Sequence, residues 1–201
     1  MAKKIGIFAG TFDPVHSGHV AFAQAALDTG LEKVMFLPEP RPRRKQGVRA
    51  LEHRVAMVQT AVKPEKGMGT IVLDQARFSA HETLPLLQAR FKGYKLVLLF
   101  GDDVITHLAH WPHVEELVQS VELMVASRHT DETDLKNAFK TLAITGHLKF
   151  GYQIVHPKSQ DIASSKIRLQ IRRGVSPVQN LPSGVENYIR KHGLYSAADS
   201  K

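Results

Sequence analysis

The chain has 201 residues and no cysteine, and its 27 basic and 19 acidic side chains give a net charge of +8. Its length fits one sizeable α/β domain, and a composition of 43% hydrophobic and 23% charged residues is that of a globular protein. The lack of cysteine excludes disulfides and thiolate metal sites, while the charge indicates a preference for anions without choosing between nucleic acid and a phosphorylated metabolite.

Strand-like and helix-like segments alternate along the chain. Short apolar runs predict strands at residues 3–10, 33–38, 70–74, 95–103, 121–128 and 151–157. Apolar residues at helical spacing, several with a serine before them or a glycine after them, predict helices at residues 18–28, 51–62, 81–91, 114–120, 133–143, 164–174 and 183–195.

Strands separated by helices predict an α/β fold, namely a Rossmann-like, doubly wound parallel sheet with helices on both faces. We expect a single domain at residues 1–195, with a small C-terminal helical part at 164–195 and a frayed tail at 196–201. In such sheets ligands bind beyond the carboxyl ends of the strands, where the strand order reverses. The polar loops after the first, second and fourth predicted strands should therefore gather at one edge.

The loop after the first strand reads 10-GTFDPVHSGHV-20 and combines backbone freedom with two imidazoles. Gly10 and Gly18 let the backbone approach a ligand closely, and the helix that starts near Gly18 directs its N–H groups into the same space. His16 and His19 are three residues apart, so both can face one side. The segment therefore predicts an anion site with a phosphate as its occupant.

Two other interpretations apply to the same loop. One histidine could cap the helix while the other packs, which is the common role of a single histidine. A metal ion could bind both imidazoles, but no nearby glutamate or cysteine supplies a third ligand at a suitable spacing. The Walker A and G-x-G-x-x-G patterns are absent.

This loop resembles the G-x-F-x-P-x-H-x-G-H signature of the HxGH nucleotidyltransferase superfamily. The segment 164-SSKIR-168 is similar to that superfamily's S-S-T-x-I-R element, although Ala163, Ser164 and Ser165 occupy the first three positions. Within the superfamily the chain resembles the nicotinate-nucleotide adenylyltransferase family over nearly its whole length. The further blocks that carry the resemblance are FLPEPRPRRK with LEHRVAMV, FGDDVITHLAHWPHVEELVQSVELMVASR and LPSGVENYIRKHGLY.

The resemblance implies adenylyl transfer from ATP to nicotinate mononucleotide in NAD biosynthesis, giving deamido-NAD and pyrophosphate, with Mg²⁺ accompanying ATP and no metal site on the protein. It implies two catalytic residues, His16 and His19. The ATP-binding residues it implies are Gly10, Thr11, Phe12, His16, Gly18, His19, Ser164, Ser165 and Arg168. The substrate-binding residues it implies are Lys45, Arg54, His81, Thr83, Asp103 and Trp111.

One departure leaves the identity of the acceptor open. Ser79 and Ala80 stand where the family usually has a Tyr-Thr pair that helps hold the pyridine ring and its carboxylate. His81 could compensate as a donor. Acceptors that would keep the same chemistry are nicotinamide mononucleotide, phosphopantetheine and a polyol phosphate.

A nucleic-acid-binding protein is the alternative from another class, suggested by the charge and by the basic segment PRPRRK. The sequence has no interleaved aromatic and basic pattern and no helix-turn-helix or RNP-like motif, so we expect no nucleic-acid partner. No apolar segment is long enough for a membrane span, and the basic start lacks a signal-peptide cleavage site, so we expect a cytoplasmic protein. A homo-oligomer is compatible with the sequence.

The proposed role of the second imidazole can be tested by replacing His19 with alanine. Loss of one donor to the transition state is expected to lower kcat on the order of 10²–10³-fold. Steady-state kinetics, with circular dichroism as the check that the fold is intact, measure this effect. Unchanged turnover would rule out the role.

Overall fold

The computed structural model describes residues 2–42, 45–75, 77–127, 132–145, 149–158 and 162–197. Within these ranges the strands are β1 (Lys4–Gly10), β2 (Lys33–Pro38), β3 (Met68–Thr70), β4 (Lys95–Gly101), β5 (Glu122–Ala126) and β6 (Tyr152–Val155). The helices there are α1 (Ser17–Asp28), α2 (Leu51–Val62), α3 (Thr83–Arg90), α4 (Asp102–Leu108), α5 (Val114–Ser120), α6 (Glu132–Thr145), α7 (Ser164–Arg172), α8 (Val185–Lys191) and a 3₁₀ turn, η1 (Val178–Asn180).

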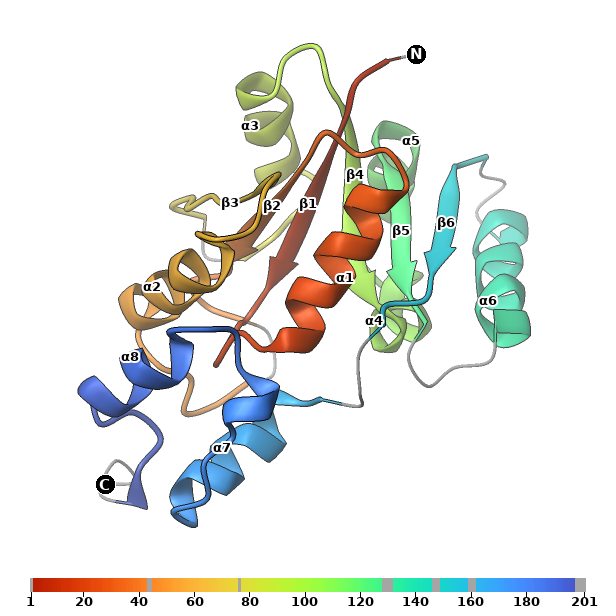
Figure 1. The fold of residues 1–201 in the computed structure, drawn as a ribbon. Coiled ribbons are helices and arrows are strands. Elements are labelled where there is room, and N and C mark those ends of the chain that lie inside the picture. Colours follow the sequence, from red (N-terminus) through yellow and green to blue (C-terminus); the bar gives the residue numbers. More distant parts are fainter. Residues whose placement is uncertain are drawn as a thin grey trace.

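The strands form one parallel sheet in the order β3-β2-β1-β4-β5-β6, as Figure 1 shows. β1 lies between β2 and β4, pairing Ile7 with Met35 on one side and with Leu98 on the other. The chain therefore winds outward from β1 in one direction, returns to the middle at β4, and winds outward in the other. This is the doubly wound arrangement expected from the sequence, and the strand order reverses between β1 and β4.

Helices cover both faces of the sheet because the buried strand residues alternate between the faces. One apolar core packs α1, α2, α7 and α8 against one face of the sheet, which Figure 1 shows nearest the viewer, and includes Phe8 and Leu99 from the strands. A second core packs α3, α4, α5 and α6 against the other face, and includes Ile7 and Leu98. None of the helices in the described ranges is long and apolar enough to cross a membrane.

Most predicted elements occur within one or two residues of the expected bounds, but the third strand, the last helix and one unpredicted helix differ. The last helix was expected at residues 183–195, whereas α8 ends at Lys191 and is followed by a turn with positive φ at Gly193 and Tyr195. The apolar run 70–74 predicted a strand, whereas β3 ends at Thr70, where its pairing with β2 stops. Ile71 is buried in the second core and its N–H still donates to the Phe36 carbonyl oxygen at 2.8 Å. The apolar run at residues 70–74 therefore continues past the end of β3 because Ile71 is buried, although it is not part of the strand. Helix α4 was not predicted, because its sequence DDVITHL carries no clear helical period.

The packing predicts a large difference between two leucines of the chain. Leu99 on β4 is 2% exposed and Leu86 on α3 is 42% exposed. Leu99→Ala is expected to lower the free energy of unfolding by about 2–5 kcal/mol, because it leaves a cavity in the first core. Leu86→Ala should change it by less than about 0.5 kcal/mol. Denaturant titration measures both, and equal effects would contradict the assignment of Leu99 to the core.

Candidate functional site: a phosphate-binding loop at the reversal of strand order

The loop after β1 lies at the edge where a doubly wound sheet opens a crevice. β1 and β4 are neighbours, and the chain leaves β1 for α1 on one face and β4 for α4 on the other. The two connections diverge, so the carboxyl ends of these strands leave space for a ligand between them. The glycine- and histidine-containing loop enters this edge directly from Gly10.

The two histidines of the loop are held against each other at the start of α1. His16 is the N-cap residue, and its backbone N–H donates to Nδ1 of His19 at 3.1 Å. Their rings stack with centroids 3.6 Å apart and an angle of 26° between the planes. His16 is buried and His19 is partly exposed. Because Nδ1 of His19 accepts a hydrogen bond, the proton of its neutral ring sits on Nε2, which is the nitrogen that can donate to a ligand.

Gly10 and Phe12 shape the loop from inside. Phe12 has a positive φ of 51° and is 2% exposed, with its ring at 5.1 Å from the His19 ring. A Cβ at Gly10 would lie 2.8 Å from the Phe12 ring, so the glycine makes room for that ring. The Phe12 side chain is therefore part of the core beneath His19, and only its backbone can face a nucleotide.

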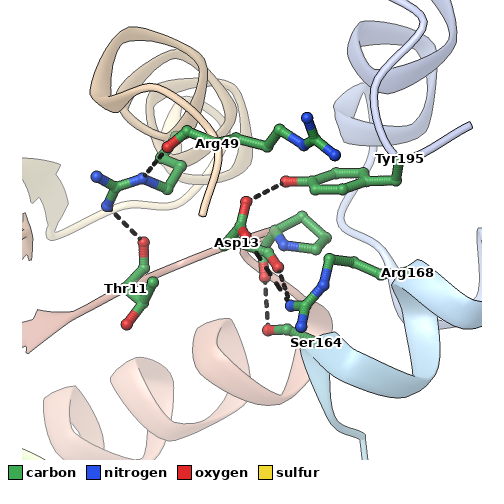
Figure 2. Close-up of polar contacts among 8 residues, drawn as sticks. Thr11, Asp13, Arg49, Ser164, Arg168 and Tyr195 are labelled. Carbon is green, nitrogen blue, oxygen red and sulfur yellow. Dashed lines mark hydrogen bonds and ion pairs between the residues drawn. The ribbon is translucent and has the colours of Figure 1, made fainter. Parts of the chain in front are cut away.

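The serine-initiated helix α7 meets this loop, as the sequence predicted. The hydroxyl of Ser164 donates to the Pro14 carbonyl oxygen at 2.9 Å, and Nη1 of Arg168 donates to the Asp13 carbonyl oxygen at 2.6 Å. Figure 2 shows both bonds joining α7 to the loop. Ser165 is exposed beside Ser164 at the first turn of α7. Two segments about 150 residues apart thus present N–H groups, hydroxyls, imidazoles and a guanidinium to one region.

Asp13 is a buried carboxylate at the centre of this region. Its Oδ1 accepts a 2.6 Å hydrogen bond from the Tyr195 hydroxyl, and its Oδ2 lies 4.0 Å from Nη1 of Arg168. The guanidinium of Arg49 stands over the Tyr195 ring, 5.4 Å from its centroid. Burial, together with the negative charge of Asp13, raises the pKa of the Tyr195 phenol above its ordinary value, so the hydroxyl stays protonated and donates.

Arg54 ties the loop to α2 and to the segment after β2. Its guanidinium donates to four backbone carbonyl oxygens, those of Arg49, Thr11, Glu39 and Pro40, at 2.8–3.1 Å. The side chain is 1% exposed, and burial lowers the pKa of the guanidinium while Asp13 opposes that shift. From the sequence we expected Arg54 to contact a substrate phosphate. In the structure its guanidinium binds backbone carbonyl oxygens and holds three segments together, and a contact with substrate stays a prediction.

The acceptor residues expected from the sequence gather in a second group, at the start of α3 and of α5. The Trp111 and Phe78 rings lie 6.5 Å apart, and the exposed His81 ring stacks on that of His113 at 5.3 Å. Thr83 is buried, and its hydroxyl donates to the Arg77 carbonyl oxygen and accepts from the Ser79 N–H, so it closes the turn before α3.

Two other residues that the sequence analysis expected to bind the acceptor are placed less fully. Lys45 is exposed in the loop between β2 and α2. Asp103 lies in α4, and its side chain is outside the part of the chain that the structure describes.

Glu39 joins the two groups and was not singled out from the sequence. Its N–H donates to the Gly10 carbonyl oxygen at 2.9 Å, and its Oε1 accepts from the Phe78 N–H at 2.8 Å. Asp13, Arg49, His113 and Tyr195 were missed as well. Asp13 and Tyr195 lie inside the two sequence blocks GTFDPVHSGH and LPSGVENYIRKHGLY. Their place in blocks that carry the family resemblance was the feature of the sequence that could have identified them.

Comparison with known proteins agrees with this geometry. The sequence matches the cytidylyltransferase-like family over residues 7–170. A relative from Gloeobacter violaceus, described as a "Probable nicotinate-nucleotide adenylyltransferase", is 35% identical over 97% of this chain and 97% of its own. A relative of the same description from Neisseria gonorrhoeae (strain NCCP11945) is 33% identical over 96% of this chain and 98% of its own.

Solved structures share the fold. Plasmodium falciparum nicotinic acid mononucleotide adenylyltransferase complexed with NaAD matches with a TM-score of 0.77 at 16% identity, covering 96% of this chain and 97% of that chain. The same protein complexed with APC matches with a TM-score of 0.74. At this identity the likeness establishes the common Rossmann-like architecture.

The bonds of Arg54 predict that lysine cannot replace it. Arg54→Lys keeps the charge but loses the planar fork, so several buried carbonyl oxygens lose their donor. The free energy of unfolding should fall by about 2–4 kcal/mol. Arg172→Lys, an exposed position at the end of α7, is the matched control and should change it by less than about 0.5 kcal/mol. Chemical denaturation of the two variants tests this, and equal stabilities would contradict the buried network.

Proposed function

We propose, since the chain belongs to the cytidylyltransferase-like family and within it to the nicotinate-nucleotide adenylyltransferases, that it transfers the adenylyl group of ATP to nicotinate mononucleotide in NAD biosynthesis. The products are deamido-NAD and pyrophosphate. The observation that carries this function is the relationship at 35% identity over 97% of both chains, together with the contact between the histidine loop and α7.

The reaction is a displacement at the α-phosphorus of ATP. An oxygen of the acceptor's 5′-phosphate forms a bond to the α-phosphorus, and the bond from that phosphorus to the oxygen bridging to the β-phosphorus breaks. The electron pair leaves with pyrophosphate. A phosphate monoester has a second pKa of about 6, so the attacking oxygen is already ionised and needs no general base. Catalysis therefore consists of alignment and charge stabilisation.

The histidine pair supplies donors to the α- and β-phosphates in this proposal. We assign Nε2–H of His19 as one of these donors, because Nδ1 accepts the hydrogen bond from the His16 backbone N–H. His16 supports it by stacking and by capping α1, whose first N–H groups face the same anion. Thr11 follows Gly10 at the mouth of the loop and offers its hydroxyl.

Helix α7 receives the β- and γ-phosphates. Nη1 of Arg168 is engaged with Asp13, and the planar guanidinium carries further N–H groups in a geometry that matches phosphate oxygens. The hydroxyl of Ser165 and the first N–H groups of α7 add neutral donors, while the Ser164 hydroxyl donates to the Pro14 carbonyl oxygen and holds α7 against the loop. The guanidinium groups of Arg49, Arg54 and Arg168 all act on the Asp13–Tyr195 pair, so the region favours a polyanion.

Magnesium fits this site as a companion of ATP. Among the described residues no group of three or more His, Asp or Glu side chains is placed to hold a metal ion. Mg²⁺ in nucleotide sites keeps several waters and is held mainly by phosphate oxygens. The phosphates of ATP and water can therefore hold the ion without a cluster of carboxylates from the protein. When bound, the ion neutralises charge on the leaving pyrophosphate.

The pyridine end of the acceptor would lie against the second group of residues. Trp111 offers a ring for stacking, and the paired imidazoles of His81 and His113 offer donors to a carboxylate. His81 stands in a turn that lacks the family's Tyr-Thr pair, with Ser79 and Ala80 in its place. Because the missing pair would help hold the pyridine carboxylate, its replacement favours nicotinamide mononucleotide as the second candidate acceptor.

Pyrophosphate release with a panel of acceptors tests the proposal. With ATP and Mg²⁺, nicotinate mononucleotide is expected to give the largest kcat/KM, followed by nicotinamide mononucleotide, whose neutral amide gains less from the imidazole donors. Phosphopantetheine and a polyol phosphate are the negative controls. A faster reaction with either control would move the chain to another acceptor class, and release that persists without any acceptor would contradict adenylyl transfer.

A further inference from the structure

Tyr195, in the turn after the last helix, is packed against the loop after β1 although the adenylyl transfer chemistry assigns it no role. It follows α8 through a turn in which Gly193 and Tyr195 both have positive φ, 61° and 62°. This turn brings the phenol back into the first core, where it is 1% exposed. Its hydroxyl reaches Asp13, which lies 182 residues earlier in the chain.

The hydroxyl of Tyr195 holds one oxygen of the buried Asp13 carboxylate. Oδ1 of Asp13 accepts the phenol proton at 2.6 Å, and Oδ2 then faces Nη1 of Arg168 at 4.0 Å. The same Nη1 donates to the Asp13 carbonyl oxygen at 2.6 Å, as Figure 2 shows. The phenol, the carboxylate and the guanidinium therefore form a chain of contacts that ends at a proposed triphosphate ligand.

The direction of the carboxylate matters because ATP is itself an anion. A carboxylate turned toward the triphosphate would repel it, and the hydrogen bond from the Tyr195 hydroxyl opposes that rotation. A buried tyrosine is also a rigid donor, since its ring is packed in the core and its burial keeps the proton on the oxygen.

We propose that Tyr195 is a positioning residue of the phosphate site, which holds the Asp13 carboxylate so that Arg168 and the loop of residues 11–16 keep the arrangement that grips the triphosphate. This inference rests on the proposed ATP-dependent function. It makes the C-terminal turn part of the nucleotide site, so that the last residues of the fold control affinity for ATP and pyrophosphate and leave affinity for the acceptor unchanged.

A merely structural tyrosine would behave differently, and Tyr188 is the matched control. Tyr188 lies on α8 in the same C-terminal segment, and its hydroxyl contacts Nδ1 of His53 on α2 at 3.0 Å. Removing either hydroxyl deletes one hydrogen bond of the C-terminal segment. Only the bond from Tyr195 leads to Asp13 and Arg168.

The test compares Tyr195→Phe with Tyr188→Phe in the full chain. Calorimetry with ATP and Mg²⁺, and inhibition by pyrophosphate, report on the triphosphate site, while KM for nicotinate mononucleotide reports on the acceptor site. Tyr195→Phe is expected to lower the affinity for ATP and for pyrophosphate by about tenfold, because one charge-assisted hydrogen bond is lost. The KM for nicotinate mononucleotide should not change. Tyr188→Phe should leave all three values at wild-type level. Wild-type ATP affinity in a folded Tyr195→Phe protein would overturn the proposal.

Two further measurements keep the outcome interpretable. In an Arg168→Gln background the additional effect of Tyr195→Phe on ATP affinity should largely disappear, because the contact through which it acts is gone; full additivity would contradict the proposed chain of contacts. If Tyr195→Phe does not fold, Tyr195→Met fills the space without a hydroxyl and takes the same binding test.

The binding measurements also separate this inference from the proposed function. A wild-type protein that binds ATP but releases no pyrophosphate with any acceptor refutes the function and leaves the affinity comparison valid. A Tyr195→Phe protein with wild-type affinity refutes the positioning role alone.

Discussion

A carboxylate removed from water must be compensated by donors and positive charge, and Asp13 obtains both from distant parts of the chain. Tyr195 donates from the C-terminal turn, Arg168 approaches from α7, and Arg54 acts on it from α2. Each of these elements packs in the same apolar core. The requirement to satisfy one buried charge therefore fixes how the first loop, the late helix and the chain end meet.

This arrangement explains why the loop after β1 is suited to phosphate. The compensating groups around Asp13 are guanidinium ions, which keep N–H groups and positive charge beyond what one carboxylate neutralises. The stacked imidazoles stand on the same loop, over the Phe12 ring, so their position is set by the core rather than by solvent. A ligand meets donors that are already in place, which is the condition for stabilising charge without reorganisation.

The sequence was sufficient for the fold because alternating apolar runs and helical spacings are local signals. It also predicted that residues 10–20 and 164–168 converge, through the resemblance of both segments to one superfamily and the rule on strand order. The roles of Tyr195 and Arg54 could not be predicted, since a tyrosine near the C-terminus and an arginine within a basic stretch look alike whether buried or exposed. Their partners are a carboxylate 182 residues away and four backbone oxygens. The early end of β3 could not be predicted either. An apolar run indicates that residues are buried, but it does not indicate whether their backbone pairs with a neighbouring strand.

The division of the molecule into two apolar cores has a consequence for how such enzymes diversify. The groups proposed to grip ATP stand on elements that pack in the first core, and those proposed to meet the acceptor stand on elements of the second, with the sheet between them. Changes on opposite sides of a sheet that share no side-chain partners act on stability nearly independently. Substitutions in the turn before α3, such as Ser79 and Ala80 in place of the family's Tyr-Thr pair, can therefore accumulate without disturbing the residues proposed to bind ATP.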